Sequence, residues 1–381
     1  MVSQFLNSCL LRKLLNSKTG LLFVLFLCAC SSEKNDISGR KNELTLTRYS
    51  RLLSIQKNEN IWNVTINNPW QNTNDTQLKY RFSEDKSNDS CIHIPLKKVV
   101  CFSSSHVAMI SLLDQQQTIA GVSGLHFICD STVVRMANEG LIWEAGFEDN
   151  INYELFLKEK PDVALIYGVG TEHARYVARL EKLGIKVIYI AEYLENHPLG
   201  RLEWIRLFGI LFNEYEKADS IFREKSALYE NTCISITEQS KLPLVFSGSP
   251  IGDNWYIPGG DSYMAHLIKD AGGKFIFIQN HSNESYPVAL ENAYRHLLSA
   301  DIWINCDIPA DVVYAKDSRY RNTPPVIQGR VYSHNLRSEK GKGDDFWESG
   351  TVNPEIILKD LIYIFHPDSM KDYHPVYYQK L

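Results

Sequence analysis

The chain has 381 residues and a formal net charge of −5 at pH 7, and 44% of its residues are hydrophobic. This composition provides apolar material for folded cores, and the near-neutral charge excludes the strongly basic surface typical of a nucleic-acid partner. The part of the chain beyond residue 95 is long enough for two domains of ordinary size.

A basic segment and a short apolar run open the chain. Arg12, Lys13 and Lys18 precede an uninterrupted apolar stretch, residues 21–27. A membrane-spanning helix needs about 20 apolar residues, so this run is too short to cross a bilayer comfortably. The layout is typical of a secretory signal peptide, which we assign to residues 1–29.

The end of this segment, Leu27-Cys28-Ala29-Cys30, resembles a bacterial lipobox. The last cysteine of a lipobox is acylated and becomes the new N-terminus, so Cys30 is the predicted lipidation site. Cys28 fits less well, because the bulky Leu27 precedes it. Residues 30–43 form a polar tether, and we expect a lipid-anchored protein of the bacterial cell envelope that touches the membrane through its lipid only. An ordinary signal peptide or an uncleaved signal anchor is the alternative.

Residues 44–95 contain short alternating segments, 61–66 and 78–82, separated by turns rich in Asn, Pro and Asp. Alternation of this kind predicts β-strands, so we expect a small β-rich extension. Five cysteines lie beyond the signal segment, and their spacing fits no zinc pattern. We interpret most of them as buried small hydrophobes, and a disulfide between Cys101 and Cys129 stays open.

Strand-like and helical segments alternate over residues 96–199. Short connections between them favour a parallel sheet with right-handed crossovers. Serines 103–105 offer N-caps for the first helix, and Gly184 closes the last one. The expected strands are 98–102, 119–124, 163–167 and 187–190, and the expected helices are 106–113, 153–160 and 171–183.

Residues 200–232 have apolar residues at helical spacing and predict one long helix. A second α/β set follows over residues 233–381, with strands at 242–246 and 302–305 and helices at 261–271, 291–298 and 353–365. The predicted fold is therefore α/β, with two Rossmann-like lobes of mostly parallel sheets joined by one long rigid helix, plus the small β-rich N-terminal extension.

Two positions in the first lobe are candidates for ligand contact. Tyr167 ends a predicted strand beside glycines, and ligands of open α/β sheets lie beyond the carboxyl ends of strands. A tyrosine that caps the core is the alternative. Ser104, Ser105 and His106 lie at the first strand-to-helix turn, where free backbone N–H groups suit an anionic group. His106 is more simply interpreted as a polar contact than as a metal ligand.

The order of segments from about residue 95 to about residue 367 resembles the ABC-importer binding proteins for iron–siderophore complexes, haem and cobalamin. Residues 152–166, NYELFLKEKPDVALI, carry the resemblance most clearly. Residues 99–106 and 119–123 support it, as do Pro258-Gly259-Gly260, Ala271-Gly272-Gly273 and residues 288–304. The nearest likeness is to lipoproteins of Bacteroidetes-type bacteria, and the segment 38–94 has no counterpart in short-tailed members.

The resemblance implies a monomer with no intrinsic cofactor or metal, which captures a ferric siderophore, haem or corrinoid between its lobes. It places cleft residues at Trp255 and Tyr256 and at Asp345, Phe346 and Trp347. The alternative for these aromatic residues is local packing in turns.

Two glutamates at corresponding places in the lobes are the predicted docking residues. Glu154 and Glu291 each begin a helix that precedes a lobe strand. The resemblance implies that they meet arginines on an ABC permease, which works with its ATPase subunit; arginine–carboxylate pairs are directional. A carboxylate that only stabilises the helix N-terminus is the alternative.

Enzyme hypotheses find little support. The sequence has no Gly-x-Ser-x-Gly elbow, no His-Glu-x-x-His and no P-loop. The predicted function is capture and delivery, not catalysis. A surface scavenger of corrinoid or haem without its own permease is the alternative, and a secreted enzyme on the same scaffold is a third option that lacks a visible catalytic dyad.

Overall fold

A four-stranded sheet forms the N-terminal extension, as the alternating segments predicted. Its strands follow in the order β1-β2-β3-β4, and only the β3–β4 pair is parallel. One face is apolar, because Ile55, Val64 and Ile66 are fully buried between more exposed neighbours. The strands are β1 (Leu53–Asn58), β2 (Ile61–Asn67), β3 (Gln77–Ser83) and β4 (Ile92–His93).

The computed structural model describes residues 46–147, 150–170, 173–233, 242–306, 312, 314–315, 317–339 and 342–381. The predicted signal peptide, the tether and Cys30 lie outside these residues. The described residues belong to one compact unit, Leu44–Leu381. No helix in this described part is long and apolar enough to cross a membrane. The domain boundaries proposed within the unit stay predictions.

A parallel five-stranded sheet follows the extension and confirms the first predicted α/β set. Its strand order is β7-β6-β5-β8-β9. The central strands β5 and β8 are buried on both faces, as expected for a sheet covered by helices. The elements are β5 (Val99–Cys101), α1 (Ser104–Leu112), β6 (Ile119–Val122), α2 (Ser131–Asn138), β7 (Trp143–Glu144), α3 (Tyr153–Glu159), β8 (Val163–Ile166), α4 (His173–Lys182) and β9 (Lys186–Tyr189).

The predicted helix over residues 200–232 is helical but divided into α5 (Pro198–Leu202), α6 (Ile205–Leu211) and α7 (Tyr215–Thr232). The break before α7 has a local cause, because Asn213 has a φ of 60° and so cannot continue a right-handed helix. The two longer helices then pack together at Gly209, where a Cβ would lie 2.5 Å from that of Ala218.

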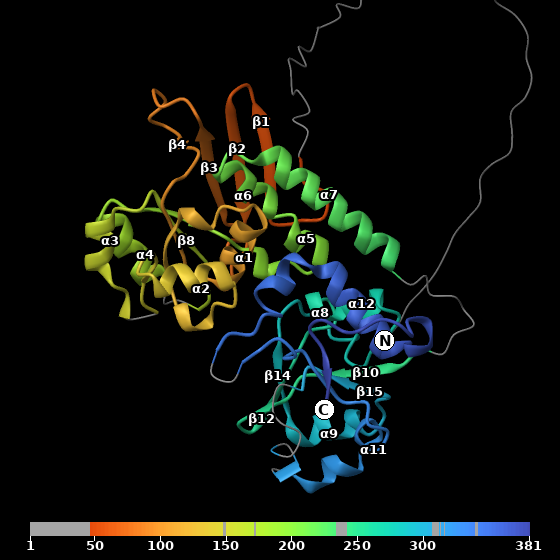
Figure 1. Cartoon of the computed structure of the whole chain (residues 1–381). Helices are drawn as coiled ribbons and strands as arrows, with labels where there is room; N and C mark the ends of the chain where they lie inside the picture. Colours follow the sequence, from red (N-terminus) through yellow and green to blue (C-terminus); the bar gives the residue numbers. More distant parts are fainter. Residues whose placement is uncertain are drawn as a thin grey trace, which may run out of the picture. The chain divides into compact units, whose positions relative to one another are not determined.

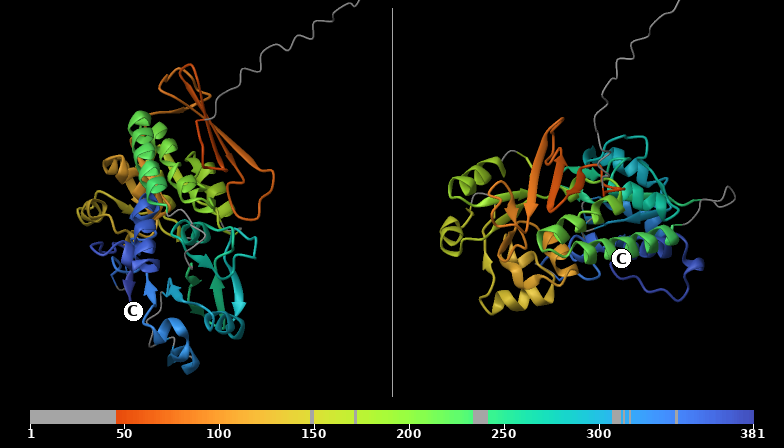
Figure 2. Two further views of the ribbon diagram at one scale, coloured as in Figure 1. Left: turned by 90° about the vertical axis from the view of Figure 1, so that its right-hand side faces the viewer. Right: turned by 90° about the horizontal axis from the view of Figure 1, so that it is seen from above.

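Helix α7 nevertheless joins the two α/β parts. Near its start, Lys217 donates to the carbonyl of Leu113 at 2.8 Å, in the first part. Toward its end, Lys225 pairs with Glu355 at 2.7 Å, in the second. Its 18 residues give a length of about 27 Å. Figure 2 shows α7, in green, running from the side of the extension toward the blue helix α12 (Pro354–Phe365).

The second α/β part contains a parallel sheet of order β13-β10-β15 and an antiparallel sheet of order β11-β12-β14. Its core centres on Phe246, Trp255 and Trp303, which are fully buried and pack against one another. Figure 1 shows both parts and the extension. The elements are β10 (Leu244–Ser247), β11 (Pro250–Ile251), β12 (Asn254–Ile257), α8 (Tyr263–Asp270), β13 (Lys274–Phe275), β14 (Tyr286–Ala289), α9 (Leu290–Leu297), β15 (Ile302–Ile304), α11 (Pro324–Ile327), β16 (Tyr332–Ser333) and β17 (Gln379–Lys380).

Candidate functional site

A cleft of about 980 Å³ is lined by three parts of the chain. The extension contributes part of the lining through the end of β2 and most of the loop before β3, which we together call the extension loop (residues 67–74). The segment before α6 and the second α/β part supply the rest. The lining residues used below are Arg51, Gln71, Asn72, Asn74, Tyr193, Glu195, Arg201, Tyr256 and Trp347.

Arg201 is the buried cation of this cleft. It lies on α5, is only 8% exposed, and its guanidinium lies over the ring of Tyr263 at 5.1 Å. Burial raises the pKa of Tyr263 to about 12, although Arg201 acts in the opposite direction. Among the described residues Arg201 has no ion-pair partner, and its Nε has no hydrogen-bond partner. An uncompensated buried charge is costly, so this arginine is available to an anionic group in the cleft.

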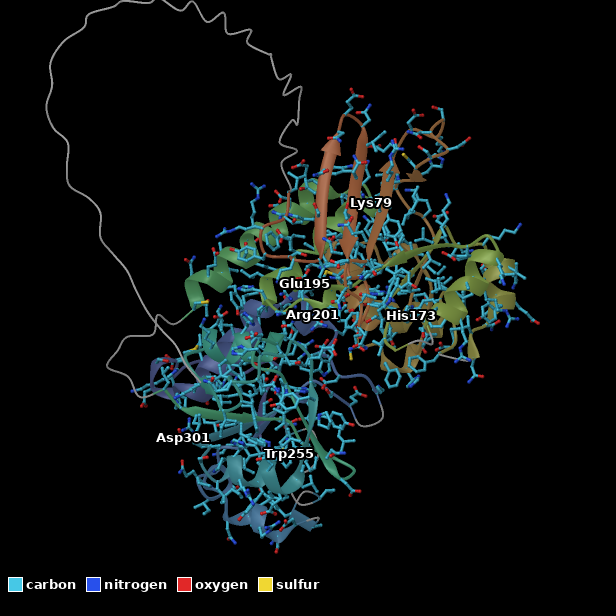
Figure 3. All side chains as sticks on the ribbon, turned by 180° about the vertical axis from the view of Figure 1, so that it is seen from behind. Lys79, His173, Glu195, Arg201, Trp255 and Asp301 are labelled. Atoms are coloured by element: carbon cyan, nitrogen blue, oxygen red, sulfur yellow. The ribbon has the colours of Figure 1, made fainter. Side chains whose placement is uncertain are left out.

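Glu195 lines the same cleft as Arg201, and both are labelled in Figure 3, but the carboxylate of Glu195 is held by hydrogen bonds within the protein. Its carboxylate accepts hydrogen bonds from the backbone N–H groups of Arg51 and Leu52, at 3.1 and 3.2 Å. It also accepts one from the indole N–H of Trp204 at 3.1 Å. These donors stabilise the negative charge in place.

The aromatic residues predicted to lie in the cleft fall into two groups, because some side chains line the cleft and others pack in the core. Tyr256 and Trp347 line the cleft and are each 44% exposed, so both are free to stack on a ligand. Trp255, the neighbour of Tyr256 on β12, points to the opposite face and is fully buried. Phe346 is buried against His334, at 4.4 Å between ring centroids. The expectation that Trp255 and Phe346 contact ligand is therefore corrected to a core role.

Asp345 lies outside the cleft as well. It pairs with Arg337 at 2.5 Å, and both residues line a separate cavity of about 400 Å³. Glu348 lines the same cavity and accepts hydrogen bonds from the backbone N–H groups of Cys129 and Asp130, at 2.8 and 2.6 Å. Asp345 thus lines a cavity between the two α/β parts, and Glu348 makes the hydrogen bonds across it.

The start of α1 does not reach the cleft either. Ser103 caps the helix, Ser104 is half-buried, and Ser105 donates to Glu192 at 2.5 Å. His106 is fully buried and its ring lies 6.4 Å from that of Phe208. Burial lowers its pKa, which favours the neutral ring. None of the three candidates lines the cleft, because helix α1 packs into the core at its first turn.

Tyr167 lines a smaller cavity of about 180 Å³, together with His173 and Tyr176. Its ring meets that of Tyr193 edge-on at 6.0 Å, and Tyr193 lines the large cleft. The hydroxyl of Tyr193 donates to the carbonyl of Gly168. The ring of Tyr193 thus separates Tyr167 from the large cleft, and the role of Tyr167 in ligand contact stays a prediction.

Sequence reasoning missed Arg201, Tyr193 and the whole contribution of the extension. The available signal was the composition of the extension loop, where Asn and Gln are concentrated between two strands. From the sequence alone, this composition predicts only a turn. Arg201 gave no signal, because an arginine within a helical segment is ordinary until its missing partner is seen.

The two predicted docking glutamates are exposed, and neither lines the cleft. Each is the second residue of its helix, Glu154 on α3 and Glu291 on α9. Glu291 pairs with Arg319 at 2.8 Å. Within the described part of the chain Glu154 makes no ion pair. The two carboxylates therefore differ in how freely they can meet an external cation.

None of the five cysteines beyond the signal segment forms a disulfide in the structure, so the Cys101–Cys129 bridge left open above is not formed. Cys91, Cys101 and Cys306 are buried, as interpreted from the sequence. Among the residues that the structure describes, no group of three or more His, Cys, Asp or Glu is placed to hold a metal ion.

Two α/β parts, joined by a helix and sharing a cleft of polar and aromatic residues, define a solute-binding protein. The profile of the family described as periplasmic binding protein matches residues 99–334. The chain therefore belongs to the periplasmic binding protein family, whose members bind solutes and are typically not enzymes.

Two relatives named as lipoproteins match most of this chain. An uncharacterized lipoprotein of Methanocaldococcus jannaschii is 24% identical over 393 residues, which cover 91% of this chain and 90% of the relative. A second uncharacterized lipoprotein of that organism is 26% identical and covers 76% of each chain.

Solved structures share the fold at low identity. A possible iron-binding solute-binding protein from Staphylococcus epidermidis has a TM-score of 0.55 at 17% identity, covering 72% of this chain and all of that one. A periplasmic binding protein from Veillonella parvula has a TM-score of 0.57 at 12% identity, covering 82% and 99%. A haem-binding protein of Vibrio cholerae has a TM-score of 0.55 at 15% identity, covering 71% and 99%.

Proposed function

We propose that this chain is the solute-binding lipoprotein of an ABC importer and that its cleft holds a ferric siderophore, haem or a corrinoid. The observation that carries the proposal is the cleft itself, with a buried arginine that makes no ion pair to any described residue and two exposed aromatic rings. Its volume lies at the upper end of the range of about 300–1,000 Å³ typical of small-molecule sites. A large, partly planar ligand with an anionic group fits this chemistry.

Similar proteins support the ligand class. The Staphylococcus epidermidis and Vibrio cholerae proteins of the same fold are described as iron-binding and haem-binding. Haem has two carboxylates and cobalamin a phosphodiester, and either group would pair with Arg201. The rings of Tyr256 and Trp347 would stack on the flat face of such a ligand.

Delivery completes the proposed function. Lipidation at Cys30 would hold the protein at a membrane, and the surface carboxylates Glu154 and Glu291 would meet arginines of the permease. Two relatives named as lipoproteins support the anchor. A surface scavenger without a permease is the second candidate; it would share the cleft but gain nothing from two exposed docking acids.

Calorimetric titration of the soluble protein, residues 31–381, with haemin, ferrichrome and cyanocobalamin tests this proposal. We expect one-to-one binding of at least one probe with a Kd in the micromolar range or tighter. Absence of saturable binding for all three would contradict the proposed ligand class. Cys30→Ala in the full chain should release the protein from membranes, and a variant that stayed acylated would contradict the anchor.

A further inference from the structure

The extension lies against the family fold and contributes directly to the cleft. Arg51, Leu52 and seven residues of the extension loop line the same cavity as Tyr256 and Trp347. The family profile matches only from residue 99 onward, so this contribution comes from outside the matched region. Two attachments fix the extension in this position.

The first attachment is a pair of buried carboxylates. Glu203, which is fully buried, accepts hydrogen bonds from the backbone N–H groups of Arg48, Tyr49 and Ser50, at 2.8, 2.7 and 2.8 Å. Glu195 accepts from the next two N–H groups, as described above. Removing the extension would leave two buried charges without these donors, which is costly. The start of the extension is thus fixed to the segment that carries Arg201.

The second attachment is the ring of Trp70, within the extension loop. Its backbone forms a bridge with Gly168 at the end of β8. Its ring lies 4.9 Å from that of Tyr189 and 5.2 Å from that of His173, measured between centroids. A Cβ at residue 168 would lie only 2.5 Å from that of Trp70, so glycine is needed for this approach. The loop is therefore held in place before any ligand arrives.

The carboxamides of the loop fall into two groups. Asn67 accepts from Gln77 at 2.9 Å, and Asn68 accepts from the N–H of Thr76 at 3.2 Å, so both serve the loop itself. Gln71, Asn72 and Asn74 line the cleft, and their side chains make no hydrogen bond to any residue that the structure describes. Each of the three offers a carbonyl oxygen and an NH2 group.

We propose that the extension forms an additional wall of the ligand cleft and that Gln71, Asn72 and Asn74 select solutes with a rim of amide groups. The inference rests on the proposed binding function and refines its ligand class. A corrinoid carries carboxamides around its ring, and a peptide siderophore carries backbone amides; haem has a hydrocarbon edge apart from its two carboxylates. A site that hydrogen-bonds an amide rim disfavours a ligand that leaves these groups unpaired.

The test compares binding of three probes by two variants. The triple variant Gln71→Ala, Asn72→Gly, Asn74→Ala removes the free carboxamides, and glycine at residue 72 retains its left-handed backbone, with a φ of 60°. The control is Lys79→Ala, an exposed residue of β3 that does not line the cleft and is labelled in Figure 3. Thermal melts establish that each variant folds. If the triple variant does not fold, Asn74→Ala replaces it in the titrations.

We expect the triple variant to bind cyanocobalamin or ferrichrome at least ten-fold more weakly, and Asn74→Ala about three-fold more weakly. Haemin affinity should change by less than three-fold, and Lys79→Ala should leave all affinities unchanged. Binding of an amide-rimmed probe by the wild type with unchanged affinity in the triple variant would overturn this inference alone. Equal losses for haemin and the amide-rimmed probes would overturn the selectivity. No binding of any probe by the wild type would overturn both this inference and the proposed function.

Discussion

Arg201 is a buried residue of the cleft, and we expect it to favour ligands with an anionic group. Replacing it with methionine retains an apolar side chain against Tyr263 but removes the guanidinium. A hydrogen bond to a charged group contributes about 1.5–3 kcal/mol, so Arg201→Met should weaken binding of an anionic ligand about ten-fold or more. Titrations with haemin and cyanocobalamin measure this loss, and ferrichrome, which is neutral, serves as the internal control.

The matched protein control for this change is Arg135→Met, on the exposed surface of α2. It should leave all three affinities unchanged. Equal weakening of ferrichrome and haemin by Arg201→Met would show that the arginine acts through packing. Unchanged haemin and cyanocobalamin affinities would contradict the proposed anion contact.

Glu348 gives the protein a pH dependence. Burial raises its pKa to about 7, although the N–H groups of Cys129 and Asp130 act to lower it. The folded state therefore retains a proton on Glu348 up to a higher pH, whereas the unfolded chain releases it near the ordinary pKa of 4.5. Glu348 contributes most to the free energy of unfolding below about pH 4.5. As the pH rises toward 7, this contribution falls by about 3 kcal/mol.

Urea unfolding at pH 5 and pH 7.5 measures this dependence. The difference in the free energy of unfolding between the two pH values should shrink in Glu348→Gln, which cannot titrate. The same pH difference in the wild type and the variant would show that other groups cause it.

At the scale of elements, most strands and helices could be predicted because their signals are local. The α12 helix begins with Pro354 at its first turn, and α1 is capped by Ser103. The predicted single helix over residues 200–232 was wrong in continuity, because apolar spacing continues across the turn at Asn213. The spacing of apolar residues indicates which face of a helix is buried. It does not reveal a single residue whose backbone angles are not helical.

The site could be predicted much less well, because contacts distant in sequence create it. Trp70 and Gly168 are nearly a hundred residues apart, and no local pattern connects them. The neighbours Trp255 and Tyr256 were both proposed as cleft residues, but adjacent residues of a strand face opposite sides. Only one of the two could line the cleft, and the structure shows that it is Tyr256.

Because buried Glu203 attaches the extension, we expect its replacement to lower the free energy of unfolding strongly. Glu203→Ala leaves three backbone N–H groups without their acceptor and removes one of the two carboxylates paired with the buried guanidinium of Arg206, the other being Asp219. Breaking a buried pair typically costs about 3–5 kcal/mol. Urea unfolding should show a loss of this size.

The control is Glu230→Ala, since Glu230 is about half-exposed and pairs with Arg48 at 3.4 Å. An exposed pair contributes about 1 kcal/mol or less, so this variant should remain close to the wild type. Similar losses for Glu203→Ala and Glu230→Ala would contradict the role assigned to the buried acid.

At the scale of the whole molecule, binding and delivery should be separable. Glu154 and Glu291 lie on α3 and α9, outside the cleft. Changing both to alanine should leave the Kd of the soluble protein unchanged and reduce cellular uptake strongly, because charge-assisted contacts to the permease are lost. Reversal to lysine should reduce uptake further.

The structure adds a distinction between the two acids. Glu291 already pairs with Arg319, whereas Glu154 is free of ion pairs in the described part of the chain. Glu154→Ala alone should therefore reduce uptake more than Glu291→Ala, with exposed Glu181→Ala as the control. Normal uptake in the double variant would contradict docking, and lost ligand binding with an intact fold would place the acids in the binding site.

The most direct test of the account is a crystal structure of the protein with its tightest-binding probe. We expect the ligand in the cleft, between the extension loop and the rings of Tyr256 and Trp347. Where the ligand has an anionic group, that group should lie within hydrogen-bond distance of Arg201. A ligand in the small cavity beside Tyr167, or one that makes no contact with the extension, would contradict it.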